Sequence, residues 1–179
     1  MYTHVALLRG LNVGGHNKVA MSDLRDLLAD LGFGGVISLL QTGNLVIESD
    51  RQAGAALERL LEKATTERLG VFVDYIVRSA DELEKIVARN PFPKEAKDAP
   101  SNLLVMFLKT TPSAKDEDAL RASIKGPEII GRYRKQLYVV YPAGIGRSKL
   151  TGALIEQKLG SRGTARNWNT IHRLLAICK

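Results

Sequence analysis

A ten-residue stretch near the start of the chain, RGLNVGGHNK, combines the residue types that bind anions and transfer protons. Its arginine and lysine carry positive charge, its amides and imidazole form hydrogen bonds, and its glycines let a ligand approach the backbone closely. A helical pattern follows, and the N-terminus of a helix favours anions. The residues that we predict to bind a ligand here are Arg9, Asn12, Gly14, Gly15, His16 and Lys18.

The glycine spacing of this stretch excludes two phosphate-binding motifs. It is G-x-x-x-G-G, which matches neither the P-loop, G-x-x-x-x-G-K-[ST], nor the dinucleotide fingerprint, G-x-G-x-x-G. Two interpretations stay open: an anion-binding loop, or a strand-to-helix connection that needs glycine only for its geometry. Gln41 and Asn44 are further candidate ligand-binding residues, at a hairpin connection predicted around Thr42, Gly43 and Asn44.

A second glycine loop, AGIGRSK, covers residues 143–149. Ser148 is predicted to cap a helix, which would place Arg147 and Lys149 beside the positive end of the helix dipole. A phosphate or carboxylate bound by both cations would relieve this unfavourable arrangement. The alternative is two solvated cations. The predicted ligand-binding residues of this loop are Arg147, Ser148 and Lys149.

A third stretch, GTARNWNTIHRL, contains the single tryptophan of the chain. Arg166, Asn167 and Trp168 are candidate ligand contacts, since a guanidinium stacks on rings and pairs with acids. The structural alternative is stronger here. A lone tryptophan usually anchors a core, and an asparagine at a helix start usually caps it. His172 is expected on the surface.

The sequence offers no catalytic signature. The three histidines and Cys178 lack metal-ligand spacing, no G-x-S-x-G elbow occurs, and no paired carboxylates lie in an apolar context. We therefore predict no metal and no cofactor, and the sequence leaves open whether the protein is an enzyme and which residues would be catalytic.

The hydrophobic pattern predicts an α+β protein with the same order of elements in each half. Residues 1–90 give strand, helix, hairpin, helix and strand, the split β-α-β pattern, followed by a short helix. A proline-containing linker follows at 91–101. Residues 102–179 repeat the order, except that a helix replaces the fourth strand. We predict two tandem ferredoxin-like (alpha-beta plait) subdomains with mostly antiparallel sheets, the second with an extra C-terminal helix.

The charge of the chain is uneven. Residues 1–120 hold 14 basic and 17 acidic side chains, and residues 121–179 hold 12 basic and 2 acidic ones, for a net charge of +7. A basic C-terminal third favours a phosphate-bearing or polyanionic partner. A lone cysteine fits a reducing cytoplasm, and no signal peptide or apolar run long enough for a membrane span is present. The sequence leaves the oligomeric state open.

Three functions remain as hypotheses. The first is binding of a small anionic or phosphate-bearing ligand through the two glycine loops and Arg166. The second is nucleic-acid binding through the basic C-terminal third, with Tyr133, Tyr138 and Tyr141 as stacking rings, although no RNP1 motif is present. The third is an enzyme whose site spans both halves, with His16 as acid or base.

Four stretches together resemble a known family. In chain order they are ALLRGLNVGGHNKVAM, LLQTGNLVIES, GIGRSKLT and TARNWNT. They are similar to a bacterial family catalogued as a domain of unknown function, DUF1697, and the resemblance runs essentially from residue 2 to residue 177. It implies the tandem plait fold. It implies no reaction, and no functional residue is carried over from it.

Overall fold

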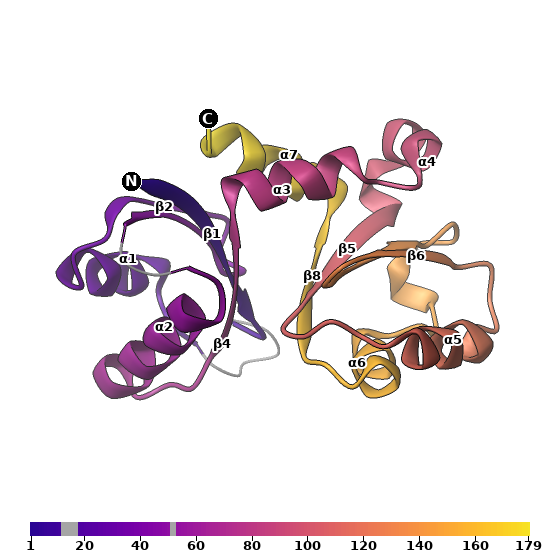
Figure 1. Ribbon diagram of the computed structural model, residues 1–179, viewed down its shortest axis with the longest axis horizontal. Coiled ribbons are helices and arrows are strands. Elements are labelled where there is room, and N and C mark those ends of the chain that lie inside the picture. Colours follow the sequence, from indigo (N-terminus) through magenta and orange to yellow (C-terminus); the bar gives the residue numbers. More distant parts are fainter. Residues whose placement is uncertain (12–17, 51–52) are drawn as a thin grey trace. The chain divides into compact units, whose positions relative to one another are not determined.

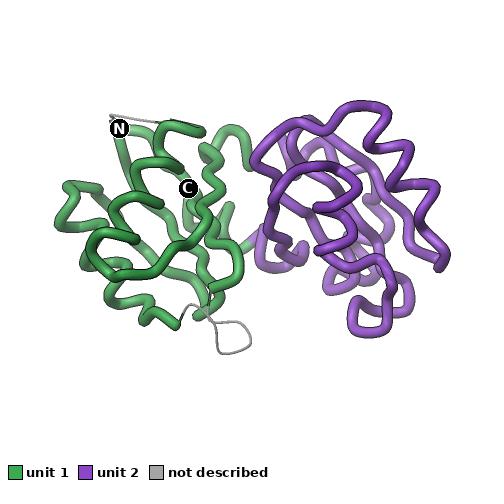
Figure 2. The backbone as a smooth tube through the Cα atoms, turned by 90° about the horizontal axis from the view of Figure 1, so that it is seen from below, with its two compact units in different colours: residues 1–84, 173–179 green, residues 85–172 purple. Residues whose placement is uncertain are grey.

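The computed structural model describes residues 1–11, 18–50 and 53–179. Contacts between residues divide the chain into two compact units, shown in Figure 2. Unit 1 comprises residues 1–84 and 173–179, and unit 2 comprises residues 85–172. No helix in the described part of the chain is long and apolar enough to cross a membrane.

Unit 1 contains a four-stranded antiparallel sheet with two helices on one face (Figure 1). The order of its strands is β2-β3-β1-β4. Its elements are β1 (Tyr2–Arg9), α1 (Met21–Asp30), β2 (Gly34–Leu39), β3 (Asn44–Ser49), α2 (Gly54–Leu69) and β4 (Asp74–Ser79). Helix α3 (Ala80–Ala88) follows, and the division between the units falls within it.

Unit 2 repeats this arrangement with the strand order β6-β7-β5-β8. Its elements are α4 (Pro93–Asp98), the 3-10 helix η1 (Pro100–Asn102), β5 (Leu103–Leu108), α5 (Ala114–Ser123), β6 (Ile129–Tyr133), β7 (Gln136–Val140), the 3-10 helix η2 (Ile145–Arg147), α6 (Gly152–Leu159) and β8 (Gly163–Asn167). Helix α7 (Trp168–Ile177) begins in unit 2 and ends in unit 1. The predicted α+β class with two tandem plaits is confirmed.

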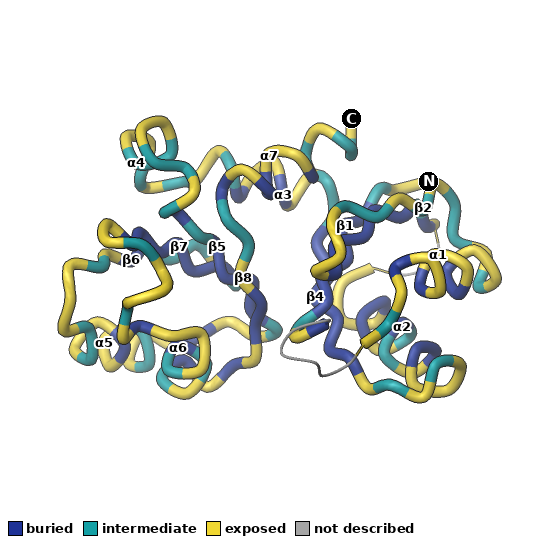
Figure 3. The backbone as a smooth tube through the Cα atoms, turned by 180° about the vertical axis from the view of Figure 1, so that it is seen from behind, coloured by how far each residue is buried: buried dark blue, intermediate teal, exposed yellow. Residues whose placement is uncertain are grey.

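Each unit has its own apolar core between its sheet and its helices. In unit 1, Leu8, Leu45 and Tyr75 of the sheet are fully buried, together with Leu24 and Leu61 of the helices. The core of unit 2 is built in the same way, from side chains that include Met106, Leu108, Leu120, Val139, Ile155 and Leu159. The dark strands in Figure 3 show this burial, which supplies most of the stability of each unit.

Local sequence signals place several helix ends correctly. The Ser79-x-x-Glu82 spacing predicts a capping box, and the backbone N–H of Glu82 does donate to Ser79 Oγ while that of Ser79 donates to Glu82. Ser113, a favourable N-cap residue three positions before Asp116, caps α5. The sequence also favours Ser22 as the cap of α1, and this expectation is wrong: α1 begins at Met21, and Ala20 at its N-cap makes no side-chain hydrogen bond.

The fourth strand of the second plait is a correction to the sequence analysis. Residues 163–167 form β8, which pairs antiparallel with β5, so the second half has all four strands. This segment, GTARN, is short and has no run of β-branched or aromatic residues. Its first residue, Gly163, is held against β5, where an added Cβ would lie 2.7 Å from the carbonyl oxygen of Phe107. Tertiary pairing therefore makes it a strand.

The residues between the two plaits also differ from a simple linker. Residues 91–101, expected to connect the repeats, belong to unit 2 and include α4 and most of η1. Pro91 packs against β6, because an added Cβ at Gly131 would lie 2.8 Å from its Cγ. Ile86 of α3 accepts a hydrogen bond from the hydroxyl of buried Tyr138. Helix α3 and the residues that follow it therefore cover part of the sheet of unit 2.

In each unit, glutamate side chains of a helix accept hydrogen bonds from the last strand of the sheet, which forms one of its two edges. The backbone N–H groups of Tyr75 and Val77, on edge strand β4, donate to Glu62 and Glu58 of α2 at 3.0 and 2.9 Å. Gly163, on edge strand β8, donates to Glu156 of α6 at 3.2 Å. Occupied edge donors are unavailable to a strand from another molecule.

Gly43 provides a test of the β2–β3 hairpin. Its φ is +91°, and a Cβ there would meet Leu8 Cβ at 2.8 Å, whereas Gly32 has a φ of +88° and open space around it. Gly43→Ala combines backbone strain with overpacking and should lower the free energy of unfolding by about 2–5 kcal/mol. Gly32→Ala should cost about 1 kcal/mol, from strain alone. Urea unfolding followed by circular dichroism measures both, and equal losses would contradict this account.

Candidate functional site

A pocket of about 620 Å³ lies at one end of the sheet of unit 2. Two connections form its walls: the one from α5 to β6 and the one from β7 to α6. They meet because Ile129, the first residue of β6, pairs with Val140, the last residue of β7. The first turns of α6 complete the wall. The volume falls in the range of small-molecule binding sites.

The charged residues that line this pocket are predominantly basic. Four cations, contributed by both connections and by α6, face one carboxylate, Glu128. The four are Lys125, Arg147, Lys149 and Lys158. Arg147 and Lys149 are exposed, so they are available to a ligand. The lining therefore carries an excess positive charge that nothing among these residues neutralises.

Ser148 has a different role from the one predicted. The N-cap of α6 is Thr151, which accepts from the backbone N–H of Leu154 at 3.2 Å. Ser148 instead donates to the Glu128 carboxylate and accepts from the backbone N–H of Leu150. Lys149 therefore lies before the helix and not in its first turn, and the expected conflict with the helix dipole is wrong. The hydrogen bond to Glu128 links the two walls of the pocket.

Aliphatic side chains lie next to the cations. The apolar residues of the lining include Ile124, Pro127, Leu150 and Leu154. Leu150 is held in place at its carbonyl, which accepts from the Tyr141 hydroxyl at 2.8 Å. Burial and then the nearby Glu128 carboxylate raise the pKa of Tyr141 to about 12, so this hydroxyl stays a donor at neutral pH. The pocket thus has an apolar side as well as a basic one.

A network of ion pairs between α5 and β6 holds the wall of the pocket that the α5–β6 connection forms. Glu117 of α5 accepts from Arg132 Nε of β6 at 2.7 Å and from Arg121 at 3.1 Å. Arg121 also donates to the carbonyl of Ile130. Because these contacts tie α5 to β6, they hold the connection between them, which carries Lys125 and Glu128.

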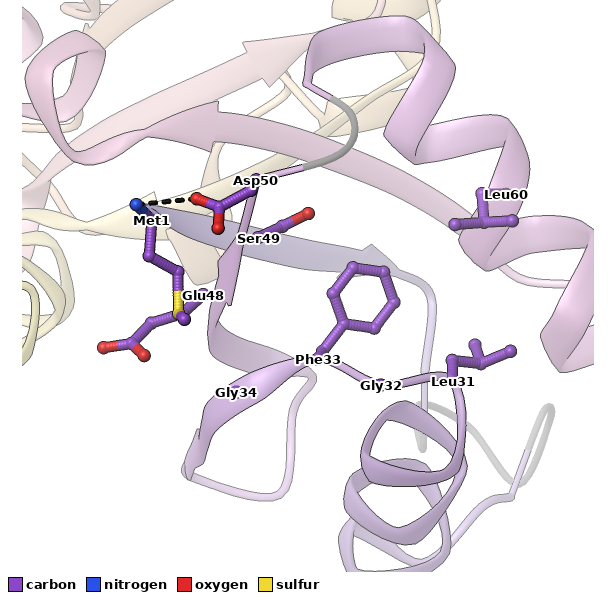
Figure 4. Close-up of a pocket in the computed structure, with 9 residues that line it drawn as sticks. All are labelled: Met1, Leu31, Gly32, Phe33, Gly34, Glu48, Ser49, Asp50 and Leu60. Carbon is purple, nitrogen blue, oxygen red and sulfur yellow. Dashed lines mark ion pairs between the residues drawn. The ribbon is translucent and has the colours of Figure 1, made fainter.

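Unit 1 has a pocket at the equivalent place in its own plait (Figure 4). Its volume is about 530 Å³, and its lining includes the C-cap of the first helix, Leu31, as that of unit 2 includes the corresponding C-cap, Ile124. The charges differ: Asp50 pairs with the N-terminal amine at 2.6 Å, and Glu48 is the second acid. Figure 4 shows the Phe33 ring between this ion pair and Leu60.

The first glycine loop is described only at its ends. Asn12, Gly14, Gly15 and His16 lie outside the described residues. Arg9 forms an ion pair with buried Asp74 at 3.7 Å. Lys18 and Gln41 line a shallow hollow together with Val19 and Ala20, so the structure brings these two predicted residues together.

Asn44 has a clear structural role in the β2–β3 hairpin. It is fully buried, and its side-chain amide donates to the carbonyl of Leu39 at 2.9 Å. These contacts close the turn that Asn44 follows. Its predicted ligand binding is not tested by this geometry.

The third stretch makes the contacts expected of structural residues. Asn167 Oδ1 accepts from the backbone N–H of Thr170 at 2.9 Å, at the start of α7. Trp168 is 6% exposed and meets the exposed His172 ring edge-on, with 5.2 Å between centroids. Arg166 donates to Thr164 Oγ1 and to the carbonyl of Ala165, and burial lowers its pKa to about 10. Ligand contact by these three residues stays a prediction.

Two of the three tyrosines proposed to stack on bases are buried. Tyr138 and Tyr141 are 0% and 2% exposed, and both hydroxyls donate to backbone carbonyls. The Tyr133 ring lies 5.4–5.7 Å from the guanidinium groups of Arg134 and Arg89. A stacking platform of all three rings is therefore absent from the described unit 2. Among the residues that the structure describes, no cluster of His, Cys, Asp and Glu could hold a metal.

The sequence analysis missed Lys125, Glu128 and Lys158. Each is one charged residue in an ordinary polar setting, separated from AGIGRSK by up to 24 residues of sequence. A faint signal exists, because Lys125 directly follows the aliphatic Ile124 and Lys158 lies one helical turn after Leu154. Only the pairing of β6 with β7 shows that they share one pocket with Arg147.

The fold and its two pockets define the class: a protein of two tandem alpha-beta plaits. The family model described as a protein of unknown function, DUF1697, matches residues 1–138, so the chain belongs to this family. Among solved structures, the conserved bacterial protein SP0830 from Streptococcus pneumoniae is similar over 99% of each chain, with 21% sequence identity and a TM-score of 0.75. This similarity supports the fold. No curated protein matches the chain.

The Glu117 network predicts a pH-dependent stability. Burial acts to raise the pKa of Glu117, but hydrogen bonds and charge from Arg132 and Arg121 outweigh it and lower the pKa below its ordinary value of 4.5. A depressed carboxyl pKa stabilises the fold above the unfolded value, and this contribution is lost as the pH falls through the folded value. Glu117→Gln should cost about 1–2 kcal/mol at neutral pH.

Urea unfolding of the wild type and Glu117→Gln should show this difference in stability at neutral pH and a smaller one in acid, because protonation of Glu117 removes its charge. Asp118→Asn, an exposed neighbour on α5, serves as the matched control and should change stability little. A gap of constant size across this pH range would argue against the ion pair network.

Proposed function

We propose that the protein binds a small anionic or phosphate-bearing ligand in the basic pocket of unit 2. The observation that carries this proposal is the convergence of Lys125, Arg147, Lys149 and Lys158 on one pocket with a single acidic residue. The predicted residues Arg147 and Lys149 lie in this set. Ser148 supports the site by joining its two walls through Glu128.

Electrostatics favour an anion over other small ligands. Like charges held around one concavity repel each other, and a bound anion converts that repulsion into attraction. The pocket walls lower the local dielectric, so each contact is stronger than on an open surface. Charge-assisted hydrogen bonds of this kind contribute about 1.5–3 kcal/mol each. Two or three of them are enough to hold a phosphate or carboxylate group.

The net charge of unit 2 as a whole adds to the attraction of an anion. Unit 2 holds 16 basic and 7 acidic side chains, a net charge of +9, whereas unit 1 holds 10 and 12, a net charge of −2. The positive field draws anions toward unit 2 at long range. It also favours nucleic acid as a second candidate partner, whose contacts would be to phosphates, since Tyr138 and Tyr141 are buried.

Differential scanning fluorimetry and isothermal titration calorimetry with phosphate, pyrophosphate and AMP test the proposal. A ligand at 100 times its Kd adds about 2.7 kcal/mol of stability, which raises the unfolding temperature of unit 2. The double variant Arg147→Ala/Lys149→Ala should weaken binding at least tenfold, because it removes two charge-assisted contacts. The matched control is Lys97→Ala/Lys115→Ala, which removes two exposed cations of unit 2 that do not line the pocket.

Absence of binding by all three compounds, or equal binding by the two double variants, would refute the pocket as an anion site. The salt dependence of binding distinguishes a nucleic-acid partner from a small ligand. Binding of an RNA or DNA oligonucleotide should weaken steeply with salt, with a slope set by the number of phosphates contacted. If the control double variant weakens oligonucleotide binding as much as the pocket variant does, the polyanion binds the general basic surface.

A further inference from the structure

The chemistry of the pocket walls narrows the class of ligand. Each wall places an aliphatic side chain beside a cation. On the α5–β6 connection Ile124 precedes Lys125, and before α6 Lys149 precedes Leu150. Both connections therefore contribute basic and aliphatic residues to the lining.

Helix α6 provides the third such pair. Leu154 and Lys158 are four residues apart, which puts both on one face of the helix with about 6 Å of rise between them. Leu154 is half-buried and packs against the core of unit 2. The aliphatic residue of this pair is thus part of the fixed core, while the lysine is on the next turn.

A bare inorganic anion would use little of this site. A phosphate ion contacts cations but leaves the partly buried side chains of Ile124 and Leu154 in contact with water, in a pocket of about 620 Å³. Burying an apolar group against them adds free energy in proportion to the area removed from water. The one carboxylate of the lining, Glu128, already accepts from Ser148, which ties it to the wall.

We propose that the ligand of this pocket is an amphiphilic anion, an acidic group joined to an apolar chain or ring. The acidic group binds the cations Lys125, Arg147, Lys149 and Lys158, and the apolar part lies against Ile124 and Leu154. This inference rests on the proposed function, since it assigns a ligand class to the same pocket. It adds one requirement to anion binding: the affinity of a ligand must increase with the size of its apolar part.

A ligand series tests that requirement by isothermal titration calorimetry, with every compound below its micelle concentration. Acetate, hexanoate and decanoate share one carboxylate and differ in chain length, and 2-naphthoate replaces the chain with a ring. Each fully buried methylene increases affinity roughly fourfold, so hexanoate should bind at least tenfold more tightly than acetate. Decyltrimethylammonium, with the same chain and opposite charge, should not bind. The stronger of decanoate and naphthoate shows whether the site prefers a chain or a ring.

Two variants separate the two parts of the ligand. Leu154→Gln should lower the ratio of decanoate to acetate affinity, whereas Arg147→Ala/Lys149→Ala should weaken all anions at least tenfold. Because Leu154 packs against the core, its variant is first checked for folding by circular dichroism, and Ile124→Thr gives a second alteration of the apolar wall. Lys115→Ala is the control that should change nothing.

The outcomes distinguish this inference from the proposed function. Equal affinities for phosphate, acetate and decanoate, all lost in the Arg147 and Lys149 variant, would overturn the amphiphile and keep the anion site. Binding of decyltrimethylammonium as tight as that of decanoate would overturn both. Failure of every anion to bind would likewise overturn both.

Discussion

The antiparallel pairing of the first and third strands is the constraint on which the site depends. In unit 2, β5 and β7 are antiparallel neighbours, so the connections that follow them leave at opposite ends of the sheet. The hairpin of β6 and β7 then places the start of β6 beside the end of β7. The segments 124–128 and 141–151 must therefore meet at one end, whatever their sequences. Their side chains decide what that end can bind.

Both glycine loops connect a strand to a helix, which suggests that they are equivalent in the repeat, but the strand order shows that they are not. AGIGRSK follows the third strand of its plait, whereas the stretch from Arg9 to Lys18 follows the first strand of its own. The counterpart of AGIGRSK in unit 1 is the segment after β3, and that segment contributes Asp50 to the pocket of unit 1. One position in the repeated fold thus carries acids in one plait and cations in the other. The repeat preserves the pocket and changes its charge.

Sequence reasoning located most helix ends from local signals, with the start of α1 at Ser22 as an exception. A capping box at Ser79, a cap at Ser113 and a left-handed glycine ending α2 at Gly70 each need only a few neighbouring residues. It failed at β8, whose strand conformation comes from pairing with β5, and at Ser148, whose partner Glu128 is 20 residues away. For the same reason Arg147 and Lys149 could be selected from sequence, but Lys125 and Lys158 could not. Their convergence is a property of the strand pairing.

The concentration of charge in the unit 2 pocket conflicts with what stability alone would favour. Elsewhere in the described chain, charged side chains at tight positions are paired: Glu117 with two arginines, and Arg9 with Asp74. In the pocket, four cations share one carboxylate, and that carboxylate already accepts a hydrogen bond from Ser148. Charged groups that lack a partner within the protein concentrate at functional sites, where a bound ligand supplies the missing interaction. The partner that we propose here is an anion, whose charge would match the four cations of the lining.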